Sequence, residues 1–229
     1  HFLANQAQNR EKAPLLPVDA AAARSLIQRA GQERRDLLLS EALRVLELYG
    51  IPTVSSRIAL NVEEAQAAAE EIGYPVAIKI IAEQISHKSD VGGVQLNLRN
   101  ASAVKEAFED MLERILKAYP STRVDGVLVQ SMVTGGRELI LGGRQDPQFG
   151  PVVMVGLGGI FVEIIEEVKV RVAPVTSLEA LEMIESLRGA QILKGARGHK
   201  PSDIQAVVDA LLRLSQLLQD FPEIQEIDI

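Results

Sequence analysis

The residues most able to do chemistry lie together in one short segment, Ile85-Ser86-His87-Lys88-Ser89-Asp90-Val91-Gly92-Gly93-Val94. The glycine pair Gly92-Gly93 lets backbone N–H groups approach an anion closely, and Lys88 can neutralise its charge. His87 can act as a nucleophile that accepts a phosphoryl group. The alternative is a surface loop that carries a histidine by chance, and for a lone histidine that would be the better explanation. The clustering favours a loop that handles phosphate.

Lys79 is the second candidate, because it stands inside an otherwise apolar run, Val76-Ala77-Ile78-Lys79-Ile80-Ile81. A buried strand favours an aliphatic side chain at this position, and burial of an unpaired ammonium group is costly. Two interpretations are equally open. Lys79 is either an edge-strand lysine that faces water on the alternate face, or a lysine required for its charge.

Two weaker candidates lie in the second half of the chain. The segment 156–161 contains Gly158 and Gly159, but it lacks the Gly-Lys-Ser/Thr of a Walker A loop and has Phe161 in place of the third glycine of a dinucleotide fingerprint. Taken alone, a tight exit from a strand explains it better. Glu226 and Asp228 could bind Mg²⁺, which takes one or two carboxylates plus phosphate oxygens, although a solvated strand face is the better explanation without context.

Hydrophobic periodicity and capping residues predict the elements that position these groups. Helices are expected at 19–31, 40–50, 61–72 and 101–118. Capping-box spacing from Thr176 to Glu179 and from Ser202 to Gln205 predicts two further helix starts. Strands are expected at 76–81, 94–98, 127–130, 138–141, 151–155, 168–172 and 226–229. This pattern predicts an α+β protein of two lobes, with a seam near 130–136, that could bind a phosphorylated ligand.

The composition excludes several classes of function. The 229 residues include 24 basic and 31 acidic side chains, and this formal net charge of −7 argues against nucleic acid or an anionic membrane surface as a partner. Because the chain contains no cysteine, disulfides, thiolate catalysis and zinc–thiolate sites are excluded, and a reducing cytoplasm suits it. No stretch of about 18 apolar residues could cross a bilayer.

Six stretches occur in an order that resembles the ATP-grasp domain, or β subunit, of the ADP-forming acetyl-CoA (acyl-CoA) synthetases. They are Tyr49–Pro52, Gly73–Lys79, His87–Val94, Asp146–Val153, Gly156–Glu163 and Pro222–Ile229. The resemblance extends from about residue 19 to Ile229. It implies an α+β (α/β) ATP-grasp fold of two lobes with the nucleotide site between them. It also implies the reversible reaction in which acyl-CoA, ADP and phosphate give the acid, CoA and ATP.

The same resemblance implies a role for individual residues. His87 matches a phosphohistidine carrier on a mobile segment, and Lys79 matches the lysine that faces the nucleotide phosphates. Asp228, with Glu226 beside it, matches a magnesium position. The other matching positions are nucleotide-binding ones, and they are the adenine-reading hinge Gln130, Ser131 and Met132, the ribose-contacting acid Glu138, and the glycines Gly92, Gly93, Gly158 and Gly159. The implied cofactors are ATP or ADP and Mg²⁺, and the implied partner is a CoA-binding synthetase domain or subunit that makes the acyl phosphate.

The expected division is a linker at 1–18, an N-terminal helical segment at 19–50, one ATP-grasp lobe at 51–130 and a second at 131–229. In the family pattern Asn-Pro follows Asp228-Ile229, so the second lobe is expected to be cut short and the chain inactive as an isolated fragment. Two alternatives resemble it too: the regulatory ATP-grasp module of a bacterial protein lysine acetyltransferase, and a succinyl-CoA synthetase β subunit, whose loops match less well. The presence of His87, Lys79 and Glu138 favours the ADP-forming enzyme.

Overall fold

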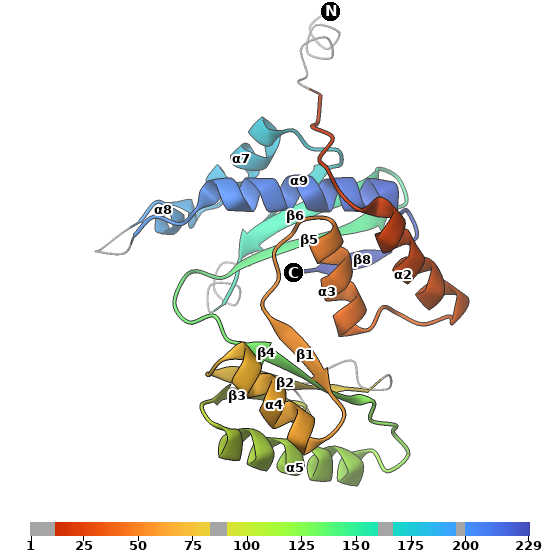
Figure 1. Cartoon of the computed structure of the whole chain (residues 1–229). Helices are drawn as coiled ribbons and strands as arrows, with labels where there is room; N and C mark the ends of the chain where they lie inside the picture. The colour runs from red at the N-terminus through yellow and green to blue at the C-terminus, as the bar shows by residue number, and fades with distance from the viewer. Residues whose placement is uncertain (1–11, 83–90, 160–166, 196–199) are drawn as a thin grey trace, which may run out of the picture. The chain divides into compact units, whose positions relative to one another are not determined.

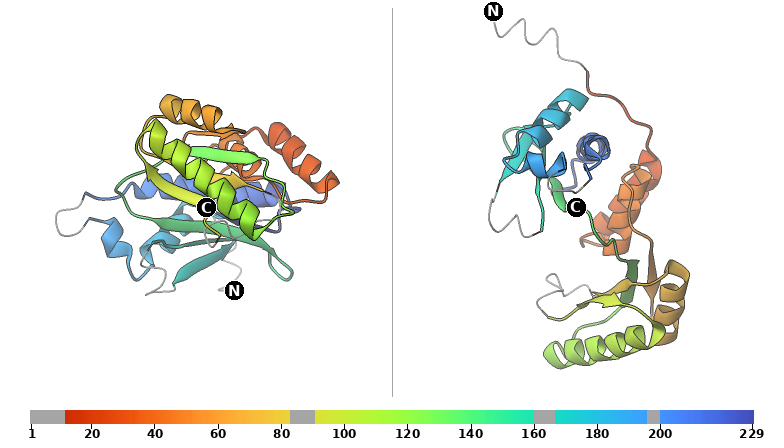
Figure 2. Two further views of the ribbon diagram at one scale, coloured as in Figure 1. Left: turned by 90° about the horizontal axis from the view of Figure 1, so that it is seen from below. Right: turned by 90° about the vertical axis from the view of Figure 1, so that its left-hand side faces the viewer.

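The computed structural model describes residues 12–82, 91–159, 167–195 and 200–229. The chain divides into two compact units, and each contains its own four-stranded sheet (Figures 1 and 2). The N-terminal unit consists of Ser25–Glu47 and Pro52–Thr134. The C-terminal unit consists of the residues up to Arg24 together with Leu48–Ile51 and Gly135–Ile229.

The N-terminal unit is an antiparallel sheet with two helices packed on one face. Its strands lie in the order β1 (Ser56–Ala59), β4 (Gly126–Ser131), β2 (Val76–Ile81) and β3 (Val94–Leu98). The helices α4 (Val62–Ile72) and α5 (Ala101–Ala118) complete one hydrophobic core with this sheet. Alternate strand residues point into that core, among them Val76, Ile78, Ile80, Val127 and Val129. The residues between them therefore face the other side of the sheet, which α4 and α5 do not cover.

Asparagine side chains fix where these two helices begin. Asn61 accepts a hydrogen bond from the backbone N–H of Glu64 (2.9 Å), and Asn100 accepts one from the N–H of Ala103 (2.9 Å). Each bond satisfies one of the N–H groups that a helix start leaves without an intrahelical partner. The helix expected at 101–118 is confirmed over its full length.

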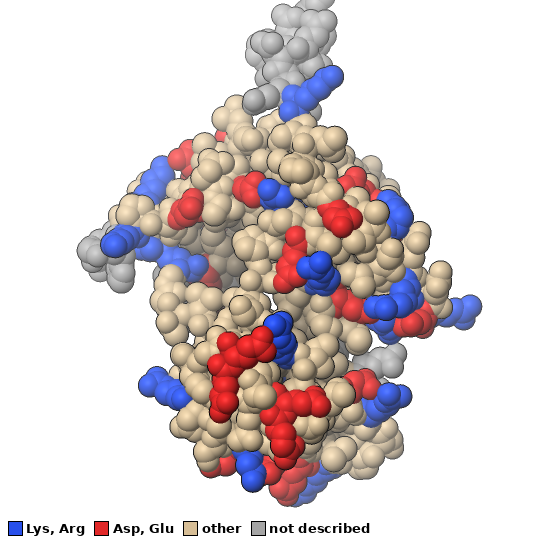
Figure 3. All heavy atoms as spheres, viewed as in Figure 1, with Lys and Arg blue, Asp and Glu red and all other residues tan. Residues whose placement is uncertain are grey.

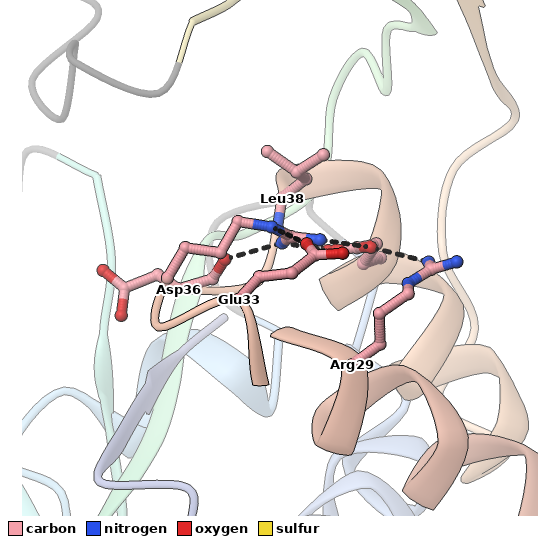
Figure 4. A network of polar contacts seen from close by, with 6 residues as sticks. Arg29, Glu33, Asp36 and Leu38 are labelled. Carbon is pink, nitrogen blue, oxygen red and sulfur yellow. Dashed lines mark hydrogen bonds and ion pairs between the residues drawn. The ribbon is translucent and has the colours of Figure 1, made fainter. Parts of the chain in front are cut away.

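The helices α2 (Ala20–Gln32) and α3 (Leu39–Leu48) are joined by a turn that a charged network holds (Figure 4). The carboxylate of Glu41, which is only 9% exposed, accepts hydrogen bonds from Arg29 (2.8 Å), from two nitrogens of Arg35 (2.7 and 3.0 Å) and from the backbone N–H of Leu38 (3.0 Å). The hydrogen bonds from Arg35 are the main reason that the pKa of Glu41 is lowered to about 2, although burial acts in the opposite direction. Glu41 therefore stays ionised down to strongly acidic pH.

The C-terminal unit is a second antiparallel sheet with helices on one face. Its strands lie in the order β7 (Val168–Val172), β6 (Gly150–Leu157), β5 (Leu139–Asp146) and β8 (Glu226–Asp228). The helices α7 (Ser177–Glu185) and α9 (Ile204–Asp220) pack on this sheet, and the short α8 (Ala190–Leu193) lies between them in sequence. A side chain at Gly143 of β5 would meet Leu218 of α9 and the carbonyl oxygen of Val152, so glycine allows the helix to approach the sheet closely.

The capping predictions for α7 and α9 have different outcomes. Thr176 and Glu179 form the expected capping box at the start of α7, and that prediction is confirmed. The prediction for Ser202 is wrong, because Asp203 is the N-cap of α9 and accepts a hydrogen bond from the N–H of Ala206 (3.0 Å). The N–H of Ser202 instead donates to the carbonyl of Leu193 (2.8 Å), which keeps Ser202 in the preceding turn.

Acidic and basic side chains are interspersed on the face shown in Figure 3, and acidic ones gather over α4, whose sequence contains Glu63, Glu64, Glu70 and Glu71. This face offers no broad basic field of the kind that nucleic acid requires. None of the helices in the described ranges is long and apolar enough to cross a membrane.

Candidate functional site

The first group of candidate residues lies on the face of the N-terminal sheet opposite α4 and α5. Lys79 is half-buried, and because its neighbours Ile78 and Ile80 point into the core, its side chain belongs to the opposite face. Ala77 is paired with Gln130 and Lys79 with Leu128, so Lys79 and Gln130 lie diagonally on that same face. β2 lies between β4 and β3, and Lys79 is therefore not an edge-strand lysine, which removes one of its two interpretations.

Ser131 is the last residue of β4 and Met132 follows it, and both are held by backbone hydrogen bonds. The N–H of Ser131 donates to the carbonyl of Ser55 (2.9 Å), and the N–H of Met132 donates to the carbonyl of Pro75 (3.2 Å). The Met132 sulfur also lies 2.9 Å from the backbone nitrogen of Asn97. These contacts fix the segment 130–132 against β1, β2 and β3.

The glycine pair Gly92-Gly93 leads directly into β3. The carbonyl of Gly93 accepts a hydrogen bond from the N–H of Ile80 (2.8 Å), so this end of the loop is tied to the strand that carries Lys79. Gly92 has a positive φ of 71°, and a Cβ there would lie 2.9 Å from the Arg114 guanidinium, which explains the need for glycine. His87 lies in the segment 83–90, outside the described residues.

The second group lies in the C-terminal unit, where three predicted residues come together. The N–H of Gly158 donates to the carbonyl of Glu138 (2.8 Å). A Cβ on Gly158 would lie 2.9 Å from the Cβ and 3.0 Å from the carbonyl carbon of Glu138. Gly159 has φ of 61°, and a Cβ there would lie 2.9 Å from the Glu138 carboxylate. The glycines thus leave room for Glu138 at the exit of β6.

This packing predicts that Gly158→Ala destabilises the protein by about 1–3 kcal/mol, because the new methyl group would press on the backbone of Glu138. The free energy of unfolding in urea measures the effect. Gly31→Ala is the matched control: Gly31 lies in α2, where a Cβ would meet nothing within 4 Å. That variant should gain up to about 1 kcal/mol from helix propensity. Equal stability of Gly158→Ala and the wild type would contradict the proposed packing.

Glu226 and Asp228 are exposed carboxylates on the face of the C-terminal sheet that the helices leave uncovered. Asp228 is paired with Gly142 of β5, and a Cβ on Gly142 would lie 2.9 Å from an Asp228 carboxylate oxygen and 2.7 Å from the Met154 methyl group. Glycine at 142 therefore makes room for both side chains. Within the described ranges no group of three or more His, Cys, Asp or Glu residues is placed to hold a metal ion.

Both carboxylates line a hollow of about 470 Å³. It is lined by residues of all four strands and of the β5–β6 turn, and they are Gly143, Arg144, Asp146, Phe149, Val152, Met154, Val170, Arg171, Val172, Glu226 and Asp228. Arg144, Met154 and Gly142 were not predicted from the sequence. A glycine pair inside a strand is the signal that could have indicated a close approach at this point.

Known proteins with similar sequences give the chain a family. The family model of an ATP-grasp domain matches residues 27–229. The β subunit of ADP-forming acetate–CoA ligase I from Pyrococcus furiosus is 47% identical over 209 residues, which are 91% of this chain and 90% of that subunit. The ADP-forming acetate–CoA ligase I of Archaeoglobus fulgidus is 44% identical over 224 residues, and the chain spans only 33% of its length.

Solved structures agree with these sequence relatives. The dinucleotide-forming acetyl-coenzyme A synthetase 1 of Ca. Korarchaeum cryptofilum, in complex with coenzyme A and Ca-AMPCP, superimposes with a TM-score of 0.86 at 42% identity, and the match covers 90% of each chain. Another structure of that protein, with Mg-AMPPCP and its phosphohistidine segment pointing towards the nucleotide binding site, gives a TM-score of 0.78 at 42% identity over 90% of each chain. This chain accordingly belongs to the ATP-grasp family, among the β subunits of the ADP-forming acetate–CoA ligases.

Proposed function

We propose that the chain is the nucleotide-binding, phosphoryl-transferring part of an ADP-forming acyl-CoA synthetase. In that reaction acyl-CoA, ADP and phosphate give the carboxylic acid, CoA and ATP. The observation that supports this most is Lys79, a half-buried lysine in a central strand on the sheet face that α4 and α5 leave uncovered. A strand interior is an unfavourable place for an ammonium group unless its charge is used.

We propose a separate nucleotide contact for each candidate residue. Lys79 would neutralise the phosphates as a point charge. At 130–132 the N–H groups of Ser131 and Met132 already donate to carbonyls of the chain, so a base would be read there by acceptors rather than by these two donors. Glu138 would accept hydrogen bonds from ribose hydroxyl groups, with Gly158 and Gly159 giving it room.

His87 would carry the phosphoryl group between a CoA-binding partner and ADP. The partner, a synthetase domain or subunit, would supply the group from an acyl phosphate. A neutral imidazole is a competent acceptor near pH 7, and the resulting phosphohistidine is a good donor to ADP. The phosphohistidine segment of the Korarchaeum protein supports this assignment.

The residues present suit Mg²⁺ as a cofactor of this reaction. Glu226 and Asp228 offer two exposed carboxylates on one sheet face, beside a hollow that is open to a ligand. Mg²⁺ commonly takes one or two carboxylates and completes its shell with water and phosphate oxygens. When bound, the metal would offset the negative charge of the phosphates.

The test is nucleotide affinity, because Lys79→Ala should bind Mg-ADP about tenfold or more weakly than the wild type through loss of a charge-assisted hydrogen bond. Isothermal titration calorimetry measures the dissociation constant. Lys105→Ala is the matched control: this lysine of α5 is half-exposed and lies 3.9 Å from Glu109 on the same helix. It should leave the affinity unchanged. If Lys79→Ala also binds Mg-ADP as tightly as the wild type, Lys79 has no role at the phosphates.

A further inference from the structure

Arg144 is a charged residue in the hollow of the C-terminal unit to which the proposed reaction gives no role. It lies on β5 two residues after Gly142 and therefore on the same sheet face, and it is paired directly with Glu226 of β8. The same face carries Asp228, next to Gly142, and the apolar side chains of Val152 and Met154. Arg144 therefore lies beside both carboxylates, on a part of the sheet face where the neighbouring side chains of β6 are apolar.

The internal contacts of Arg144 do not explain its presence. Its guanidinium lies 3.6 Å from the carboxylate of Asp146, its side chain is 66% exposed, and it donates no hydrogen bond to any described residue. An exposed pair at this distance contributes little to stability. Asp146 itself accepts hydrogen bonds from the backbone N–H groups of Gln148 (2.9 Å) and Phe149 (3.1 Å), which lower its pKa and commit it to the β5–β6 turn. The N–H donors of Arg144 are therefore available to a ligand in the hollow.

We propose that Arg144 binds the terminal phosphate of a nucleoside di- or triphosphate whose metal is held by Glu226 and Asp228. This proposal rests on the proposed function and adds a specific residue to it. Two carboxylates alone would repel a phosphate, and a guanidinium beside them supplies the opposite charge. The planar guanidinium can donate hydrogen bonds to two phosphate oxygens at once. The apolar side chains around it strengthen the attraction between the guanidinium and the phosphate. Glu226 and Asp228 would hold a metal that offsets the charge of the phosphates, so the arginine next to them would contact the phosphate end of the ligand rather than its base.

The experiment compares three adenine nucleotides that carry one, two and three phosphate groups. AMP, ADP and a non-hydrolysable ATP analogue are titrated into the chain with Mg²⁺ by calorimetry, for the wild type, Arg144→Gln and Arg144→Lys. Arg144→Gln should bind ADP and the ATP analogue about tenfold or more weakly while AMP binding changes less than twofold. Arg144→Lys keeps the positive charge but lacks the planar guanidinium, so its loss of affinity for ADP and the ATP analogue should be intermediate. Arg57→Gln is the matched control, because Arg57 is similarly exposed (59%) and pairs with Glu71 on the N-terminal unit, and it should change none of the three affinities.

The outcomes separate this proposal from the proposed function. An Arg144→Gln protein that binds all three ligands like the wild type overturns the proposal, and so does an equal loss for AMP and ADP, which indicates an effect on the fold. In both cases a wild type that binds Mg-ADP leaves the proposed function standing. A wild type that binds none of the three nucleotides overturns both.

Discussion

The His87→Ala variant is expected to lose ATP formation from acetyl-CoA, ADP and phosphate by at least about a thousandfold, because alanine cannot accept a phosphoryl group. In the transfer to ADP, the P–N bond of the phosphohistidine breaks and a P–O bond to the terminal oxygen of ADP forms. Without the imidazole there is no donor for that step. The variant, assayed together with the CoA-binding partner, should still form acyl phosphate, which can be trapped with hydroxylamine.

The chain provides a matched control for this variant, because it contains three histidines, His1, His87 and His199. His199→Ala should make ATP at the wild-type rate. With labelled phosphate, wild type and His199→Ala should carry a label on this chain that is lost in acid and retained in alkali, as expected of phosphohistidine. His87→Ala should carry none. ATP formation by His87→Ala at the wild-type rate would rule out the relay.

Local signals in the sequence were enough to find the elements that hold Lys79. An apolar run interrupted by one lysine correctly indicated β2, Asn61 correctly indicated the start of α4, and the amphipathic pattern correctly indicated α5. The sequence could not decide between an edge and a central strand for Lys79, because strand order depends on pairing between distant segments. β2 is flanked by β4, which begins 45 residues after the last residue of β2. That pairing also places Gln130 on the face of Lys79.

The C-terminal sheet was harder to predict, for a physical reason. β5 extends to Asp146, whereas the strand was expected to end at 141, because Gly142 and Gly143 weaken the strand pattern in the sequence. Both glycines are required by tertiary contacts, one by Asp228 and Met154 and the other by Leu218 of α9. For the same reason Arg144 could not be identified, since its position opposite Glu226 results from the pairing of β5 with β8.

Glu41→Gln is expected to lower the free energy of unfolding by about 3 kcal/mol at pH 7, because glutamine lacks the negatively charged carboxylate that accepts four hydrogen bonds. Arg35, whose side chain is 15% exposed, would keep Glu33 as its ionic partner among the described residues. Urea unfolding measures the change. Glu71→Gln is the matched control: Glu71 and Arg57 are also 2.7 Å apart, but their side chains are 62% and 59% exposed. The loss there should be much smaller, because exposed ion pairs contribute little to stability.

The pH dependence gives a second, independent measurement of the same carboxylate. The pKa of Glu41 is lowered from 4.5 to about 2 in the folded protein, so the folded state binds the proton less readily than the unfolded state. The stability that Glu41 contributes is therefore fully present above pH 4.5 and is lost as the pH falls towards 2. Other carboxylates with lowered pKa values, such as Glu167 and Asp146, add to the acid sensitivity of both proteins equally. The difference in unfolding free energy between wild type and Glu41→Gln should thus be constant from pH 7 to about 5 and shrink below pH 4.5. A difference that stays constant down to pH 2.5 would mean that packing around the side chain, and not its charge, stabilises the turn between α2 and α3.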